Sequence, residues 1–494
     1  MFKTRENTTL TQQALLYLLP ITVLVIFAFF TARNTIIMVV PLIILMMGFL
    51  ACFIVRLNLQ VHLLKTIALL LPFSMEMPLY MNSMIRFPGE LLTGIAAMAL
   101  IIEIFRQPLK DLTNTFHREF LWILPLLLAF LITIPFSEML FVSVKFSFIN
   151  ILYILVFLIF LARHLRKNPG LFSKLLLLYG VGIIIVALWG FYRLWQWEFN
   201  PIVMRGIFQP FYKDHTIFGA SSALLAAVFF VSGIRNQSAL NRFFLWGLSA
   251  VFIFMVIFST SRAAFLSLIF MLVVLMMMYL KIQVLHIIIS LLIAGAVVLA
   301  FRDSIEKRLI RIETISYDEH AGFMERTESA ANITTDVSNI ERLNRWVSAL
   351  RMFQERPLTG FGPGTYQFTY IPYQEPGLMT RLSVTNPFEP PEGSGGTAHS
   401  EYLLALSEMG IWGILGWFVL LGRWFYIAFK KSRNHPNRWL IIAALAGLST
   451  YIFHANFNNF LTTDKFAFLF WGTAAWLVTN LYGTEKKPEI LPAN

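Results

Sequence analysis

Apolar runs long enough to cross a lipid bilayer follow one another along most of this chain, and that succession leaves few folds open to it. Of the 494 residues, 57% are hydrophobic and 13% are charged, whereas an ordinary soluble domain is about 25% charged. Inside hydrocarbon every backbone amide must be hydrogen-bonded within the protein, which restricts spanning segments to helices and closed barrels. Because the runs do not alternate as barrel strands do, we expect an all-α, polytopic membrane protein.

About 14 spans are predicted from the runs. The first has no small-x-small cleavage site after it, so we expect it to be retained. The third is interrupted by Pro72, Pro78 and Pro88, which favours a short or re-entrant element and a total of about 12 to 14 spans. The predicted spans are 14–30, 36–55, 62–75, 88–105, 119–136, 143–162, 173–195, 215–233, 242–260, 262–280, 284–301, 405–428, 438–455 and 465–482.

One long polar segment divides the chain. Residues 1–301 carry the N-terminal helices, residues 302–398 form a polar loop, and residues 399–494 carry the C-terminal helices, all within one integrated membrane domain. Lys and Arg gather in the loops that are cytoplasmic if the N-terminus is cytoplasmic, so we expect the long loop to be periplasmic and the membrane to be the bacterial inner membrane. Basic loops facing anionic membrane lipids also explain the net charge of +12 without nucleic acid.

Metal and nucleotide chemistry find no support in the sequence. Cys52 is the only cysteine and lies within a predicted span, and no HExxH motif is present. The segment 360–364 reads Gly-Phe-Gly-Pro-Gly, but no strand precedes it and no Gly-Lys-Ser/Thr follows it. We therefore expect no metal and no cofactor.

Two arginines lie at the predicted outer ends of spans. Arg205 comes just before one span, and Arg262 occupies a tight turn between two others. Arginine on the outer side opposes the usual distribution of positive charge, and a bound phosphate would compensate for it. Snorkelling toward lipid headgroups explains Arg262 equally well.

The polar loop contains a predicted amphipathic helix at residues 339–353. Arg342, Arg345 and Trp346 lie beside its apolar positions, so we expect it to lie on the outer leaflet with basic residues at headgroup level. It ends at Arg356, because a residue before proline avoids the helical region. The apolar positions are Ile340, Leu343, Val347 and Leu350.

The glycine-rich segment and the start of the next span supply further candidates. A sharp turn through Gly362 and Gly364 would aim backbone amides and Tyr366 at a site, although a purely structural turn fits as well. His399, with Ser400 after it, lies between a Gly/Ser-rich stretch and a long span. Imidazole titrates near neutral pH and suits proton transfer, whereas a cap or interface role is the commoner use of such a residue.

A second polar cluster is predicted at the outer end of the last two spans. It consists of His454, Asn456, Asn458, Asn459 and Asp464. These side chains could bind a glycan, and ordinary solvation of a loop explains them equally well.

Taken together, these segments resemble the bacterial O-antigen ligase superfamily, which includes O-antigen polymerases and protein O-oligosaccharyltransferases. The resemblance covers residues 205–413, and the order of the segments around one long outer loop carries it. The segments are 205–208, 261–263, 342–346, 357–364, 399–403 and 408–413.

The resemblance implies transfer of a glycan from a polyprenyl-pyrophosphate donor to an acceptor hydroxyl, such as that of lipid A-core, at the periplasmic face. Arg205 and Arg262 would then hold the pyrophosphate, with Arg342 or Arg345 assisting, and His399 would accept the proton. Relatives often have His-Asn where this chain has His399-Ser400, so the role of an asparagine amide does not carry over. We expect the remaining substrate-binding residues to be Gly362, Gly364, Tyr366, Ser400 and Glu408.

Several functions remain open on the sequence alone. A polymerase would use a second lipid-linked glycan as acceptor, and a protein O-oligosaccharyltransferase would use a protein. A lipid-linked oligosaccharide flippase or other transporter would also be basic and polytopic. Transporters tend to carry polar residues at mid-membrane and inverted repeats. Here the polar residues gather at the outer rim, which favours an enzyme.

Overall fold

The computed structural model describes residues 36–78, 84–106, 118–234, 238–282, 286, 337–391 and 394–482. Over these ranges the regular secondary structure is helical except for one two-stranded hairpin. Seven of the described helices are long and apolar enough to cross a membrane, and three shorter apolar helices accompany them. The predicted all-α, polytopic class is therefore confirmed. The spans predicted at 14–30 and 284–301 lie outside the described residues.

The N-terminal part is a series of apolar helices. A π-helical stretch, η4 (Ile154–Phe160), joins two of them into one continuous span, and a 3-10 turn, η5 (Pro201–Gly206), carries Arg205. The helices are α2 (Ile36–Arg56), α3 (Gln60–Leu70), α4 (Gly89–Arg106), α6 (Leu124–Thr133), α7 (Leu140–Tyr153), α8 (Leu161–Lys167), α9 (Leu171–Gln196), α10 (His215–Ile234), α11 (Ala239–Phe258) and α12 (Arg262–Tyr279).

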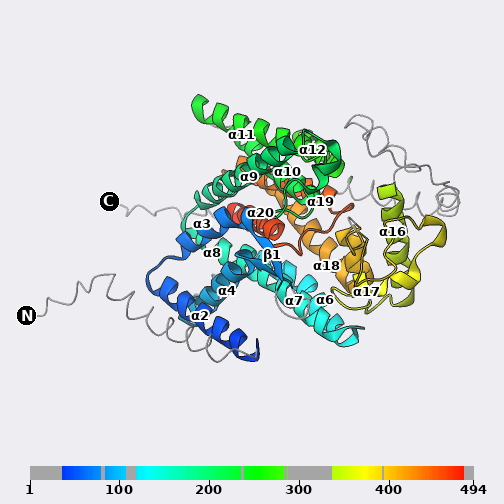
Figure 1. Cartoon of the computed structure of the whole chain (residues 1–494). Helices are drawn as coiled ribbons and strands as arrows, with labels where there is room; N and C mark the ends of the chain where they lie inside the picture. Colours follow the sequence, from blue (N-terminus) through cyan, green and yellow to red (C-terminus); the bar gives the residue numbers. More distant parts are fainter. Residues whose placement is uncertain are drawn as a thin grey trace, which may run out of the picture.

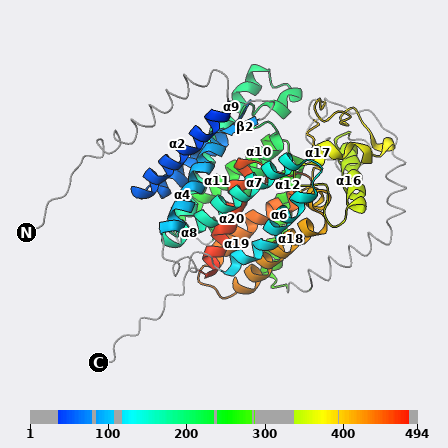
Figure 2. The same ribbon diagram turned by 90° about the horizontal axis from the view of Figure 1, so that it is seen from below.

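The C-terminal part supplies the middle of the bundle and a polar extension. In Figures 1 and 2, α16 and α17 lie at one side of the helical body next to α18, whereas α20 runs through its middle. Almost every residue of α20 is buried, against α19, η4 and α8. These elements are α16 (Val337–Glu355), α17 (Tyr366–Thr369), η6 (Ile371–Tyr373), η7 (Pro376–Leu378), α18 (Glu401–Lys431), α19 (Arg438–His454) and α20 (Asp464–Tyr482).

Small residues allow the central helices to approach closely. A Cβ on Gly447 of α19 would lie 2.7 Å from Val228 of α10, and one on Gly472 of α20 would lie 3.0 Å from Phe172 of α9. Lipid tails are as apolar as leucine, so close packing rather than the hydrophobic effect must hold spanning helices together. The core of the bundle therefore lies where α10, α19 and α20 meet.

The third predicted span is short in the structure. Helix α3 passes into a 3-10 turn, η1 (Leu71–Phe73), at Pro72, and an antiparallel hairpin of β1 (Met75–Pro78) and β2 (Met84–Phe87) follows. Proline cannot donate the backbone hydrogen bond that would continue a helix. The expected short element is present.

Several connecting segments meet at one end of the bundle, which we call the polar end. The hairpin is anchored there because Arg86 Nη1 donates to the carbonyl of Thr462 at 2.7 Å. The backbone N–H of Glu138 donates to the carbonyl of Phe361 at 3.0 Å. A Cβ on Gly219, near the start of α10, would lie 2.5 Å from Ser259 Oγ. The polar end thus gathers the hairpin, residues 197–214, 259–261, 337–400 and 455–463.

Helix α18 is broken at Gly410, and the glycine-rich segment is seated in the break. Gly410 has φ 59° and ψ −150°, a conformation that is essentially restricted to glycine. The backbone N–H of Ile411, just beyond the break, donates to the carbonyl of Pro357 at 2.8 Å. On the other side the N–H of Gly362 donates to the carbonyl of Glu408 at 2.8 Å. The loop therefore supplies partners that the interrupted helix lacks.

The predicted helix within the polar loop is present as α16, and the face that it buries against the protein is largely polar. Of the four apolar positions only Ile340 is fully buried, while Leu350 is exposed. Polar side chains share the buried face, because Glu341 and Arg345 pair there and make further hydrogen bonds. Arg345, which was expected at headgroup level, is therefore buried within the protein instead. The buried residues are Ile340, Glu341, Asn344, Arg345, Ser348, Ala349 and Met352.

Candidate functional site

His399 lies at the polar end in a backbone conformation that few residues with a side chain adopt, with φ 50°. Its backbone N–H donates to Thr397 Oγ1 at 3.4 Å, and its Nε2 lies 3.4 Å from the carbonyl oxygen of Ser394. The imidazole is only half-buried. A strained backbone that is held in place by several contacts is common at functional sites.

The residues after His399 anchor it to the bundle. Ser400 caps α18, because its Oγ accepts a hydrogen bond from the backbone N–H of Leu403 at 3.3 Å. The N–H of Glu401 donates to the carbonyl of Ala455 at 2.9 Å. His399 is therefore held next to the end of α19, and the hydroxyl of Ser400 serves as a helix cap.

Arg345 fixes the segment that precedes His399. Its side chain is 0% exposed, and its Nε donates to Glu341 Oε1 at 2.8 Å. Its Nη1 donates to the carbonyls of Gly395 and Thr397 at 2.9 and 2.8 Å. A buried guanidinium that donates to three oxygens through Nε and Nη1 orders a loop, so these described contacts of Arg345 are structural.

Charges from two segments, α16 and the residues before α10, act on the imidazole. Burial, followed by the positive charges of Arg345 and Arg342, lowers the pKa of His399 to about 3, and the carboxylate of Asp214 opposes that shift. Asp214 lies just before α10 and accepts a hydrogen bond from the backbone N–H of Thr216 at 2.8 Å. Although burial acts to raise the pKa of Asp214, the neighbouring His215 and this hydrogen bond lower it. His399 is thus neutral, and Asp214 ionised, at neutral pH.

A second histidine lies beside the first. His454 ends α19 and is 1% exposed. Arg342 and Asp214 act electrostatically on both His454 and His399. The hydrogen bond between Glu401 and Ala455 joins the segments that carry the two histidines. Residues from four segments therefore converge at one place.

The two outer arginines belong to segments of the same end. Arg262 is the first residue of α12 and is half-buried, and Ser261 before it caps the helix. The backbone of Arg205 lies in η5, and Arg193 Nη1 donates to the carbonyl of Gly206 at 2.8 Å beside it. The surroundings of the Arg205 side chain lie outside what the structure describes.

The glycine-rich turn meets Glu408 rather than an open site. Glu408 Oε2 accepts the backbone N–H of Gly364 at 2.7 Å, and Oε1 accepts that of Tyr366 at 3.0 Å. The hydroxyl of Tyr366 donates to the carbonyl of Arg345 at 2.7 Å. These contacts support the structural interpretation of the turn, in which Gly362, with φ 108°, makes the bend.

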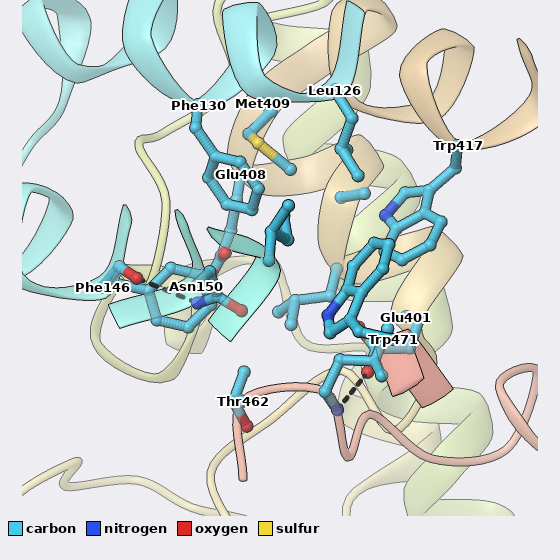
Figure 3. A pocket seen from close by; sticks show the side chains of 14 residues that line it. Leu126, Phe130, Phe146, Asn150, Glu401, Glu408, Met409, Trp417, Thr462 and Trp471 are labelled. Carbon is cyan, nitrogen blue, oxygen red and sulfur yellow. Dashed lines mark hydrogen bonds between the residues drawn. The ribbon is translucent and has the colours of Figure 1, made fainter. Parts of the chain in front are cut away.

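A small, partly open cavity lies behind this turn, between α18, α6, α7 and α20. Its volume is about 30 Å³, room for about two water molecules. Glu401 and Glu408 border it together with Asn150 and two tryptophans, Trp417 and Trp471 (Figure 3). It is too small for a sugar ring. Among the described residues, no group of three or more His, Cys, Asp or Glu side chains is arranged to hold a metal ion.

Sequence reasoning did not single out Asp214. It reads as an ordinary loop residue before a span, and only the fold brings it to His399 across the polar end. The sequence did offer one signal for Asp214, because it is an acidic residue beside His215 at the predicted outer end of a span. His454 and Asn458 were predicted as part of a polar cluster, and their closeness to His399 depends on the tertiary contact between α18 and α19.

Part of this site lies in a region that is similar to a known protein family. Residues 247–418 match the family model described as O-antigen ligase. That range includes Arg262, α16, the glycine-rich turn and His399, whereas Asp214 and His454 lie outside it. No curated protein matches the chain. Over these residues the chain is similar to the O-antigen ligase family, and its described helices are those of a polytopic membrane protein.

Proposed function

We propose that this protein transfers a glycan from a polyprenyl-pyrophosphate donor to a hydroxyl of lipid A-core, as an O-antigen ligase. The observation that carries the proposal is the neutral imidazole of His399 set between arginines and Asp214 at the polar end. A neutral imidazole can accept a proton from a hydroxyl, and nearby guanidinium groups suit an anionic leaving group.

In the proposed step, the acceptor oxygen bonds to the anomeric carbon of the donor glycan. The bond between that carbon and the phosphate oxygen breaks, and its electron pair leaves with the polyprenyl pyrophosphate. The acceptor hydroxyl proton passes to His399. A single displacement of this kind inverts the anomeric centre, and no metal, nucleotide or other cofactor enters the step.

We assign the pyrophosphate to Arg262 and Arg205, with Arg342 assisting. Preorganised positive charge around a leaving group is typically worth a few kcal/mol per contact in the transition state. Arg345 is a positioning residue in this scheme, because its hydrogen bonds go to Glu341 and to the segment before His399. Glu408, Gly362, Gly364 and Tyr366 position the same loop. Ser400 acts through the helix cap.

Binding of the donor would also activate the base. In the free protein the charges of Arg345 and Arg342 contribute to the low pKa of His399, which makes the imidazole a weak base. A bound pyrophosphate would offset these positive charges and raise that pKa. The acceptor would then be deprotonated efficiently only when the donor is in place.

The proposed setting is the bacterial inner membrane, with the polar end facing the periplasm. Basic loops at the opposite end fit that orientation. Membrane lipids are the remaining partners, and they would hold both lipid-borne substrates in register with the site. Confinement of that kind replaces entropy that an encounter in solution would cost.

The first test is the lipopolysaccharide gel pattern of a deletion strain that is complemented with the wild-type gene, with His399→Ala or with a matched control. The control is His62→Ala, which alters an exposed histidine of α3. We expect only wild type and the control to restore the ladder, with lipid-linked polymer accumulating otherwise. Core bearing one repeat unit would mean a polymerase. A lost protein glycan would mean an O-oligosaccharyltransferase. No change in any glycan would contradict an enzyme and favour a transporter.

A further inference from the structure

Several buried hydrogen-bonding atoms beside His399 have no partner among the described residues. Both ring nitrogens of His454 are in this state, as are Nδ2 of Asn458 and Nε1 of Trp346. His454 and Asn458 are 1% and 3% exposed. An unsatisfied buried polar atom destabilises a fold, so each such atom calls for an explanation, such as a ligand that satisfies it.

The three side chains belong to one location. The backbone N–H of Asn458 donates to the carbonyl of His454 at 3.2 Å, which places both residues on one turn. Phe457, between them, lies with its ring centroid 6.2 Å from that of Trp346 on α16. His399 reaches the same turn through the hydrogen bond from Glu401 to Ala455.

The chemistry of these atoms matches a sugar better than a second phosphate. A neutral imidazole offers one donor and one acceptor, while the asparagine amide and the indole add donors. Sugar hydroxyls both donate and accept, so they can satisfy this mixed set. Arg342 and Asp214 act on His454 with opposite charges, so the surroundings do not select for an additional anion. The aromatic pair Trp346 and Phe457 offers an apolar surface to the C–H face of a pyranose ring.

We propose that His454, Asn458 and Trp346 form a pyranose subsite next to His399. The inference rests on the proposed function and deepens it, because it states which side chains hold one of the two reacting glycans. The bound ring belongs either to the acceptor or to the first sugar of the donor. Both would be presented to His399 from this turn.

Kinetics of the full-length protein in nanodiscs test the subsite. Asn458→Ala and Trp346→Phe each remove an unsatisfied donor, and the second keeps an aromatic ring. Matched controls are Asn456→Ala, an exposed asparagine of the same turn, and Trp412→Phe, an exposed tryptophan of α18. We expect KM for one glycan substrate to rise roughly tenfold in each test variant, with kcat nearly unchanged, because one hydrogen bond to bound sugar is lost.

The affected substrate identifies the occupant. A raised KM for the acceptor assigns the acceptor sugar, and a raised KM for the donor assigns the donor sugar. If neither KM changes by more than twofold, or if the variants lose only thermal stability, the side chains are structural and the subsite is refuted.

A second measurement separates this inference from the proposed function. Saturation-transfer NMR with methyl glycosides, and separately with inorganic pyrophosphate, reports binding without turnover. We expect wild type to show glycoside signals and both Asn458→Ala and His454→Phe to lose them. That result would support the subsite even if no transfer were found. If wild type transfers glycan but both variants bind the glycoside as wild type does, the proposed function stands and the subsite is overturned.

Discussion

Replacement of Gly410 by alanine tests how the polar loop is attached to the bundle. Gly410 has φ 59° and ψ −150°, a conformation that costs about 1–3 kcal/mol for a residue with a side chain. An added Cβ would also lie 2.6 Å from the carbonyl oxygen of Pro357 and 2.7 Å from that of Leu358. Overpacking of this kind costs about 1–3 kcal/mol more, so we expect a total of roughly 2–6 kcal/mol.

The loop must move if alanine is accommodated. Hydrogen bonds from Ile411 N–H to Pro357 and from Gly362 N–H to Glu408, both 2.8 Å, would then be lost. We expect Gly410→Ala to lower the midpoint of thermal unfolding in nanodiscs and to speed amide hydrogen exchange across residues 357–366 and at Ile411. We also expect the rate of glycan transfer to fall, since the displaced loop is hydrogen-bonded through Tyr366 to Arg345.

Gly422→Ala is the matched control in the same helix. A Cβ there meets nothing within 4 Å, and alanine favours a helix over glycine by about 1 kcal/mol. We expect this variant to be neutral or slightly more stable. Wild-type exchange rates and an unchanged unfolding midpoint in Gly410→Ala would refute the account of the seated loop.

The remaining predictions concern the site itself. His399→Ala and Arg262→Ala should each abolish glycan transfer while the protein still inserts and unfolds normally; transfer retained in a well-expressed variant would remove that residue from the mechanism. The pKa of His399 is lowered to about 3 in the free protein, so protonation should not limit kcat/KM for the donor above about pH 4. With the donor saturating, the acidic limb of kcat/KM for the acceptor should lie at least about one pH unit higher, because bound pyrophosphate raises that pKa; coincident limbs would contradict activation by the donor. Glu341→Gln should destabilise the protein by about 3–5 kcal/mol in thermal unfolding, since it leaves the buried Arg345 without its carboxylate partner, whereas the exposed Glu355→Gln should change stability by less than about 1 kcal/mol.

The helices could be predicted from the sequence because each is determined by its own apolar run. The predicted spans 119–136 and 215–233 correspond to the apolar helical segments Glu119–Phe136 and His215–Ile234 within one residue at each end. Proline interruptions likewise marked the short α3. Local composition is sufficient for such elements, since a spanning helix satisfies its backbone hydrogen bonds within itself.

The partners of the polar residues could not be predicted in the same way. Arg345 and Arg342 look alike in the sequence, yet Arg345 binds carbonyls about 50 residues away and orders the loop. Arg345 was predicted at headgroup level, but it is buried in a pair with Glu341. Asp214 and His399 are separated by a long stretch of chain. Such contacts depend on tertiary structure, which periodicity does not encode.

Helix α18 links the two parts of the polar end. Glu401 at its start accepts the hydroxyl of Tyr451 at 2.6 Å and the N–H of Leu461 at 2.9 Å. Glu408, seven residues on, holds the glycine-rich turn from nearly the same face of the helix. His399 therefore follows a loop that Arg345 fixes and precedes a helix that is anchored at two levels. If His399 is the base that we propose, it need not reorganise when the proposed lipid-borne substrates arrive, which is the condition for efficient proton transfer in a preorganised site.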